Sequence, residues 1–163
     1  MTIHPLVEQL YFTRSEFRRC IDGVSEEDAR RRLLPMNSIG WIAGHVANLE
    51  SRWWVLLAQG EDLMPELNDL VGYGKPASTP SLAEMLAAWD VITRAANRYL
   101  ETLTSAMLLE HFIWKGKPRP ENIGTHLQRC IYHYWYHTGE ASAIRQMLGH
   151  QELPQFVGDM TQA

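Results

Sequence analysis

The sequence predicts an all-α protein, a four-helix bundle with long crossover connections. Four segments repeat apolar residues with the 3.6-residue period of a helix, whereas no segment sustains the alternation typical of strands. A chain of 163 residues is long enough for one domain with its own core. We therefore expect a single domain over residues 1–163.

The first helix is expected over residues 3–22, where Pro5 is compatible with the first turn. Its apolar stripe consists of Ile3, Leu6, Val7, Leu10, Phe17 and Ile21. The following DGVSEED ends this helix, because it combines glycine with polar residues. Within it, Ser25 and Asp28 form a capping-box pattern that predicts a short turn of helix.

The second and third helices are expected over residues 38–58 and 81–104. Ser38 is the predicted N-cap of the second helix. Ser81 and Glu84 form a capping box for the third, which has a regular apolar stripe. The last helix is expected over residues 121–148.

Two long connections join these helices. Residues 59–80 are rich in glycine and proline and lack a helical stripe. Twenty extended residues reach about twice the ~30 Å length of a 20-residue helix, so the second and third helices can run parallel. Residues 105–120 are long enough for a similar crossover, and we expect part of the excess loop to cover a site.

The composition excludes several classes of partner. Fifteen Lys and Arg residues against nineteen Asp and Glu give a net charge of −4, so we expect neither nucleic acid nor an anionic membrane as partner. The N-terminal residues do not resemble a signal peptide, and no apolar stretch reaches the ~20 residues of a membrane span. Cys20 and Cys130 lie far apart and are interpreted as reduced thiols, which favours a cytoplasmic protein.

The HYWYH sequence at residues 133–137 contains the first candidate metal ligands. When the last helix is projected at ~100° per residue, His126, His133 and His137 fall within its apolar arc. Side chains four residues apart lie ~6 Å apart on a helix, so two imidazoles with this spacing can bind one ion. The alternative is a pair of core histidines with ordinary hydrogen-bond partners.

His45, in GWIAGHVANLE, is the third candidate ligand. It lies at the rim of the second helix's apolar stripe and follows Gly44. Glycine inside a helix costs ~1 kcal/mol relative to alanine, which suggests a close approach of another element there. Taken alone, His45 is more typical of a histidine packed in the core than of a metal ligand. Together with the HxxxH pair, it would complete a site of three histidines.

These residues carry a family resemblance. The segments SIGWIAGHVANLESRWW and HYWYHTGEASAIRQMLG resemble the DinB/YfiT-like superfamily of metalloenzymes, and the resemblance extends over essentially the whole chain. It implies a four-helix bundle in which His45, His133 and His137 bind a divalent metal ion, usually zinc or nickel. Several members of that superfamily are transferases or isomerases that use a low-molecular-weight thiol such as bacillithiol, mycothiol or glutathione. The family also suggests a homodimer.

The chain departs from the family at HTGE, residues 137–140, where many members have HRGQ. Glu140 is a candidate catalytic residue whose carboxylate orients a ligand or accepts a proton. The alternative is a solvated helix residue without a catalytic role. Arg52 is a candidate for binding an anionic substrate, or it extends from the rim into solvent. The HExxH glutamate of zincin proteases is missing.

Three hypotheses follow. The first is a metal-dependent enzyme in which three protein ligands leave one coordination position of the metal open for a thiol. The thiol is then transferred to a small electrophile, or the electrophile is isomerised with its help. The second is a non-catalytic stress-response or sensor protein whose structural metal has a fourth protein ligand, with Cys130, His126 and Glu140 as candidates. In the third, the histidines are structural and no metal binds.

Overall fold

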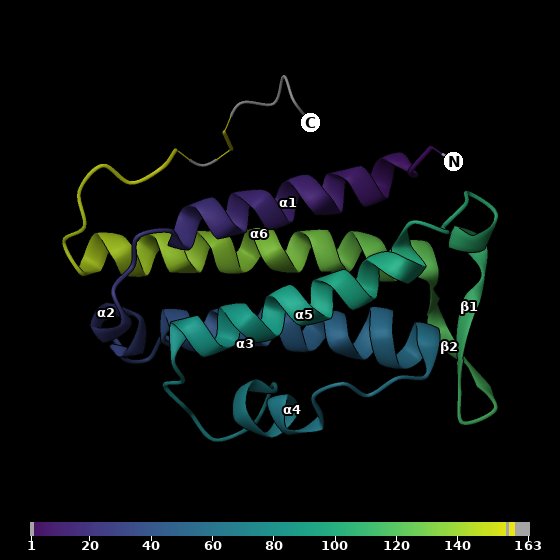
Figure 1. Cartoon of the computed structure of the whole chain (residues 1–163), viewed down its shortest axis with the longest axis horizontal. Coiled ribbons are helices and arrows are strands. Elements are labelled where there is room, and N and C mark those ends of the chain that lie inside the picture. The colour runs from purple at the N-terminus through teal and green to yellow at the C-terminus, as the bar shows by residue number, and fades with distance from the viewer. Residues whose placement is uncertain (1, 156, 159–163) are drawn as a thin grey trace.

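The computed structural model describes residues 2–155, 157 and 158, and it confirms a mostly helical chain. Its four long helices are α1 (Pro5–Ile21), α3 (Ile39–Glu50), α5 (Leu82–Leu100) and α6 (Ile123–Met147). Figure 1 shows α1 lying along α6 and α3 lying along α5. The apolar stripes predicted from the sequence form the core between these helices.

The predicted helix starts have the expected caps. The hydroxyl oxygens of Ser25, Ser38 and Ser81 accept hydrogen bonds from backbone N–H groups three residues further along the chain. Ser25 opens α2 (Glu26–Arg30), the short helical turn expected there. These bonds satisfy backbone donors that a helix start otherwise leaves without partners.

The second predicted helix consists of two parts. Helix α3 ends at Glu50, and the chain continues without a break as a π-helical segment, η1 (Ser51–Leu57). The two adjacent indoles of η1 differ in environment, because Trp54 is fully buried and Trp53 is only partly buried. Trp54 packs against rings of α5 and of the strand that follows it, so it belongs to the core of this chain and not to an interface with another subunit.

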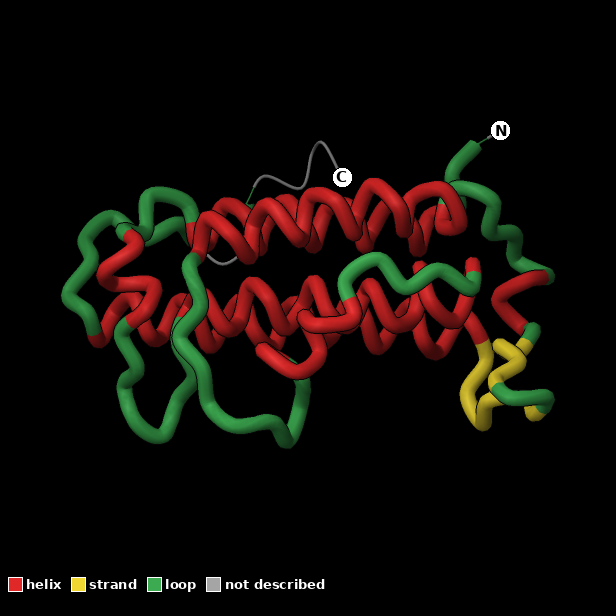
Figure 2. The backbone as a smooth tube through the Cα atoms, turned by 60° about the horizontal axis from the view of Figure 1, so that its bottom comes forward, coloured by secondary structure: helices red, strands yellow, loops and turns green. Residues whose placement is uncertain are grey.

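The first long connection is a crossover, as predicted, but it is not free of helix. Helices α3 and α5 run in the same direction, and the chain returns between them through α4 (Pro65–Val71), as Figures 1 and 2 show. The expectation of an irregular segment was wrong at this point. Helical periodicity does not reveal α4 in the sequence, because only Leu67 and Val71 are buried in it and two residues are too few for an apolar stripe.

The second long connection is not a crossover. After η2 (Met107–Leu109), strands β1 (His111–Trp114) and β2 (Lys117–Asn122) form an antiparallel hairpin at one end of the helices (Figure 2). Lys115 and Gly116 form its turn with positive φ angles of 50° and 75°. The expectation of a loop without strands was therefore wrong for residues 105–120.

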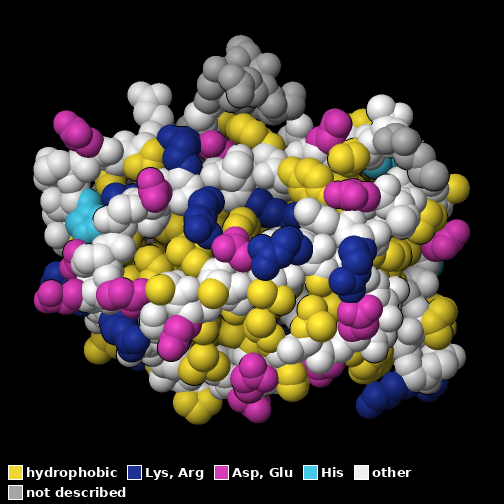
Figure 3. All heavy atoms as spheres, viewed as in Figure 1, with side chains coloured by type: hydrophobic (Ala, Val, Ile, Leu, Met, Phe, Trp, Pro, Cys, Tyr) yellow, Lys and Arg dark blue, Asp and Glu magenta, His cyan; other side chains and the backbone are white. Residues whose placement is uncertain are grey.

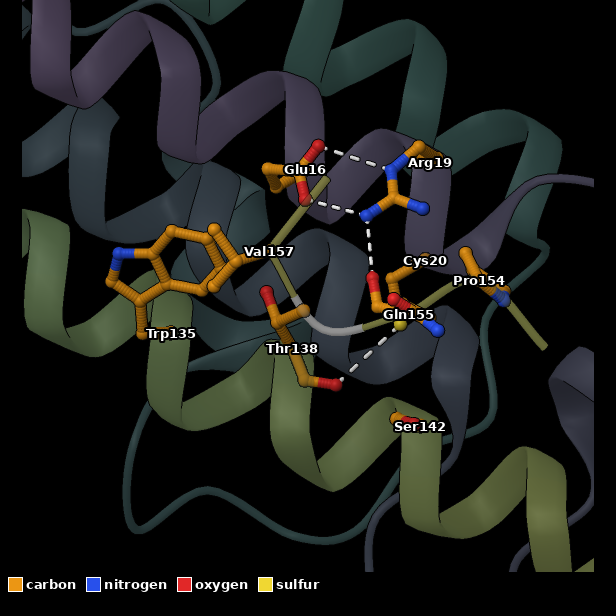
Figure 4. Close-up of a pocket in the computed structure, with 9 residues that line it drawn as sticks. All are labelled: Glu16, Arg19, Cys20, Trp135, Thr138, Ser142, Pro154, Gln155 and Val157. Atoms are coloured by element: carbon orange, nitrogen blue, oxygen red, sulfur yellow. Dashed lines mark hydrogen bonds and ion pairs between the residues drawn. The ribbon is translucent and has the colours of Figure 1, made fainter. Parts of the chain in front are cut away.

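The segment after α6 lies against α1 and α6, as Figure 4 shows. The Arg19 guanidinium donates to the Gln155 carbonyl at 2.6 Å, and the Glu16 carboxylate accepts from the Gly158 N–H at 2.7 Å. The hollow beneath this segment measures about 20 Å³, and Cys20 lies in its wall. Cys20 and Cys130 are both buried and free, so the prediction of two thiols is confirmed.

The described part of the chain contains no helix with the length and apolar character of a membrane span. Figure 3 shows basic and acidic side chains interspersed over the face formed by α1 and α5. That face therefore presents no extended area of one charge sign.

Candidate metal centre

The three predicted histidines come together in the structure. His45 extends from α3, and His133 and His137 extend from α6; one nitrogen of each lies within 4.8 Å of the others. The Nε2 atoms of His45 and His133 are 3.2 Å apart. The convergence expected from the sequence is confirmed, and in the described residues no other group of three or more such ligands was found.

The backbone of α4 and an indole fix the ring of His45. Its Nδ1 lies 2.8 Å from the carbonyl oxygen of Val71. Because a carbonyl only accepts, Nδ1 carries the proton and Nε2 keeps its lone pair. The Trp41 ring stacks on the imidazole, with centroids 4.4 Å apart and planes 15° apart.

Gly44 allows α4 and α5 to approach this site. A Cβ atom at residue 44 would lie 2.5 Å from the sulfur of Met85 and 3.0 Å from a methyl group of Val71. A side chain here would therefore force Met85 to move and would crowd Val71, whose carbonyl holds His45. The close approach inferred from this glycine is confirmed.

Glu140 orients the ring of His137. Its carboxylate lies 2.8 Å from Nδ1 of His137, one helical turn earlier on α6. The carboxylate accepts the Nδ1 proton, which leaves Nε2 as the nitrogen of His137 that can face a metal ion. This arrangement of a carboxylate behind a histidine is common among metal ligands, where it fixes the ring and raises its basicity.

Burial keeps two of the imidazoles neutral. It lowers the pKa of His45 to about 4, and the Val71 hydrogen bond offsets only part of this effect. Burial and the neighbouring His137 and His45 lower the pKa of His133 to about 3. At neutral pH both rings are therefore unprotonated on one nitrogen, the form that binds metals.

The spacing fits a tetrahedral ion. Two nitrogen ligands at about 2.0–2.1 Å from such an ion lie roughly 3.3 Å apart, close to the 3.2 Å between His45 and His133. The largest separation in the trio is at most 4.8 Å. Side-chain movements of ~1–2 Å therefore suffice to bring all three nitrogens to one ion. Nδ1 of His133 is buried without a hydrogen-bond partner among the described residues, an arrangement that stability alone does not favour.

A pocket of about 240 Å³ lies beside the trio. His45 and His133 form part of its wall, together with Asn48, Leu49, Arg52, Trp53, Tyr73 and Arg129. Arg52 is exposed, and its guanidinium has no acidic partner among residues 2–155, 157 and 158. The structure thus places Arg52 beside the predicted ligands.

The candidates for a fourth protein ligand do not join the trio. Cys130 is buried near the charges of Glu50 and Arg14, and burial raises the pKa of its thiol. Glu140 faces the back of the His137 ring. His126 lies two turns before His133 and packs against Trp53 and Phe112.

Sequence reasoning missed two contributors. The Val71 carbonyl has no sequence signature, since every residue offers a backbone acceptor. Trp41 is buried in the core, but its ring also stacks on a candidate ligand. The spacing of Trp41 and His45 by four residues on one helix is the signal that indicates such a contact.

The comparison with known families agrees with this site. The model of the DinB superfamily matches residues 9–141, which include all three histidines. None of the curated proteins matches the sequence. Since the family model covers most of the chain, the protein belongs to the DinB superfamily.

Proposed function

We propose that the protein is a metal-dependent enzyme that transfers a low-molecular-weight thiol to small electrophiles, or isomerises them with its help. The observation that carries the proposal is the convergence of ring nitrogens of His45, His133 and His137 beside a pocket. A divalent ion bound there, zinc or nickel, would lower the pKa of a thiol that binds to it.

The surrounding residues have distinct proposed roles. Glu140 positions His137 and strengthens it as a ligand, because its carboxylate contacts Nδ1 of that ring. Arg52 binds an anionic group of the substrate at the pocket wall. Trp41 prevents rotation of the His45 ring by stacking.

The chemistry needs little else from the protein. The thiol gives up its proton to solvent, its sulfur forms a bond to the electrophilic carbon, and the leaving group departs with the electron pair of the bond that breaks. No glutamate lies at a zincin position to activate water. Moreover, no described cysteine or carboxylate joins the three histidines as a fourth ligand, which favours a catalytic over a structural metal.

The proposal includes a homodimer built on a four-helix bundle. Tyr132 and Tyr136 are 65% and 73% exposed and lie one turn apart on the same face of α6. Light scattering during size-exclusion chromatography measures the oligomeric state, and a Tyr132→Ser/Tyr136→Ser double variant should be monomeric if this face forms the interface.

The test of function uses protein purified without a histidine tag. We expect zinc or nickel near one equivalent per chain by elemental analysis, and metal-dependent conjugation of a model electrophile with bacillithiol, mycothiol or glutathione. His137→Ala should abolish turnover. The matched control is His4→Asn, which removes a distant histidine but keeps a side chain able to cap α1.

Two results would overturn the proposal. Turnover that persists after the metal is removed would refute the mechanism. Protein that binds no divalent ion at micromolar concentration would leave the histidines as structural residues.

A further inference from the structure

His126 is a buried histidine that the proposed function does not use. Its side chain is 2% exposed, and neither ring nitrogen has a hydrogen-bond partner among the described residues. The Glu121 carboxylate lies 3.9 Å from Nδ1, beyond hydrogen-bonding distance. An unpaired buried polar group lowers stability, so stability does not explain this position.

The ring of His126 lines a second pocket, of about 180 Å³. The other residues of its wall are Arg119, Pro120, Glu121 and Arg129. Arg129 also lines the pocket beside the three histidines, so the two hollows meet at its side chain. His126 precedes His133 by two helical turns on α6, which places it about 10 Å from that ligand along the helix axis.

A third hollow, of about 100 Å³, connects the same elements. Arg52 of η1 and Arg119 of β2 lie in its wall together with Trp53 and Trp114. The rings of Trp53 and His126 are in contact, with centroids 4.8 Å apart. The three hollows thus share wall residues, and we call the area around them, defined by Arg52, Arg119, Arg129 and His126, the arginine cleft.

The arginine cleft is positive although the protein is negative overall. Three guanidinium groups and the single carboxylate of Glu121 are the charged side chains of these three walls. Glu121 pairs with Arg129. Arg52 and Arg119 have no acidic partner in the described part of the chain, which leaves both guanidinium groups available.

We propose that the arginine cleft is an anion-binding subsite, which takes a carboxylate or phosphate group about 10 Å from His133. Guanidinium groups form paired hydrogen bonds with both kinds of anion. The ring of His126, whose nitrogens have no hydrogen-bond partner among the described residues, lies in the floor of the cleft. Trp53 and Trp114 supply an apolar wall for the body of the ligand.

This subsite deepens the proposed function, on which the identity of the ligand depends. It selects thiols or electrophiles whose reactive atom and anionic group are separated by about 10 Å. Anion binding itself does not require the metal, so the two proposals can fail independently.

The experiment titrates chelator-treated protein with inorganic phosphate and, separately, with succinate. Chloride keeps the ionic strength constant, and the ring resonances of His126 report binding by NMR. We expect saturable chemical-shift changes with at least one anion. The anion that binds more tightly shows whether the subsite prefers a phosphate or a carboxylate group. Arg119→Ala and Arg52→Ala should each weaken binding about tenfold or more.

The matched control is Arg98→Ala, which removes an exposed arginine that pairs with Glu61 away from the cleft. It should bind the anion as the unaltered protein does. Zinc affinity, measured on the same proteins, should be unchanged in Arg119→Ala. A circular dichroism spectrum verifies that each variant is folded.

Three outcomes decide the matter. Saturable binding that depends on Arg52 and Arg119 supports the subsite even if no metal binds, in which case only the proposed function fails. Absence of saturable shifts with both anions overturns the subsite. Equal weakening in Arg98→Ala also overturns it, because the effect would then be one of overall charge.

Discussion

Two buried polar clusters lie side by side in this protein and differ in how fully their groups are paired. One is the histidine trio. The other consists of Arg14, Glu50, Trp89 and Tyr134 and joins α1, α3, α5 and α6. Glu50 follows His45 on α3, and Tyr134 follows His133 on α6, so the same two helices supply both clusters.

The second cluster has partners for its charged groups. Arg14 donates to both carboxylate oxygens of Glu50 and to Asn97. The Tyr134 hydroxyl donates to Glu50 at 2.5 Å and accepts from the Trp89 indole at 2.6 Å. A buried ion pair with these bonds connects the four long helices and needs no ligand.

The histidine trio is the opposite case. The protein fixes the outer nitrogens of His45 and His137, yet it directs the lone pairs of their other nitrogens toward His133. Two Nε2 atoms 3.2 Å apart do not stabilise each other unless a proton or a cation lies between them. The comparison teaches that a cluster whose polar groups all have hydrogen-bond partners is structural. Ring nitrogens that converge without such partners outside the trio indicate a binding site for an ion.

The largest effect is expected from breaking the paired cluster. Glu50→Ala leaves Arg14, whose side chain is 6% exposed, as a buried charge without its carboxylate. Removal of one partner of a buried pair costs about 3–5 kcal/mol in the free energy of unfolding. Urea denaturation of metal-free protein measures this loss.

The control for this prediction is the double variant Arg14→Met/Glu50→Leu. Replacing both charges by apolar side chains of similar size should recover most of the stability, since no buried charge is then unpaired. A double variant as unstable as Glu50→Ala would mean that packing, and not charge, explains the loss.

An intermediate effect is expected at the trio, with a dependence on metal. Zinc held at 100 times its Kd should raise the free energy of unfolding by about 2.7 kcal/mol. His133→Leu should abolish this gain without lowering the stability of the metal-free protein, because it removes a ring with an unpaired nitrogen. Thermal unfolding with and without zinc measures both values, and a metal-free variant that unfolds far more easily would assign His133 a structural role.

The contrast between the two clusters also shows what the sequence predicts well. Helical periodicity placed His126 and His137 on the buried face of α6, and both are buried in the structure. Serine caps marked where three helices begin. Such features depend on neighbours within a few residues, which a single sequence displays directly.

Features that depend on distant partners were not predictable. Arg14 and Glu50 are 36 residues apart, and no local pattern connects them. The hairpin escaped prediction because Phe112 is the only buried side chain of β1, too little for a detectable alternation. The π-helical turn of η1 has the same residue preferences as the α-helix it continues, so periodicity does not separate them.

The smallest of the three effects is expected from Glu140→Gln, which separates charge from orientation. Glutamine still accepts the Nδ1 proton of His137, so the ring keeps its direction, but the negative charge that makes it a better ligand is lost. Zinc affinity should fall about tenfold in Glu140→Gln and closer to 100-fold in Glu140→Ala, which also loses the acceptor. Competition with a chromogenic chelator measures both affinities, and Glu84→Gln, at an exposed helix position, is the matched control. Equal affinity in Glu140→Ala and the unaltered protein would show that His137 is held by packing alone, and the trio would then resemble the paired cluster more closely than its unpaired nitrogens indicate.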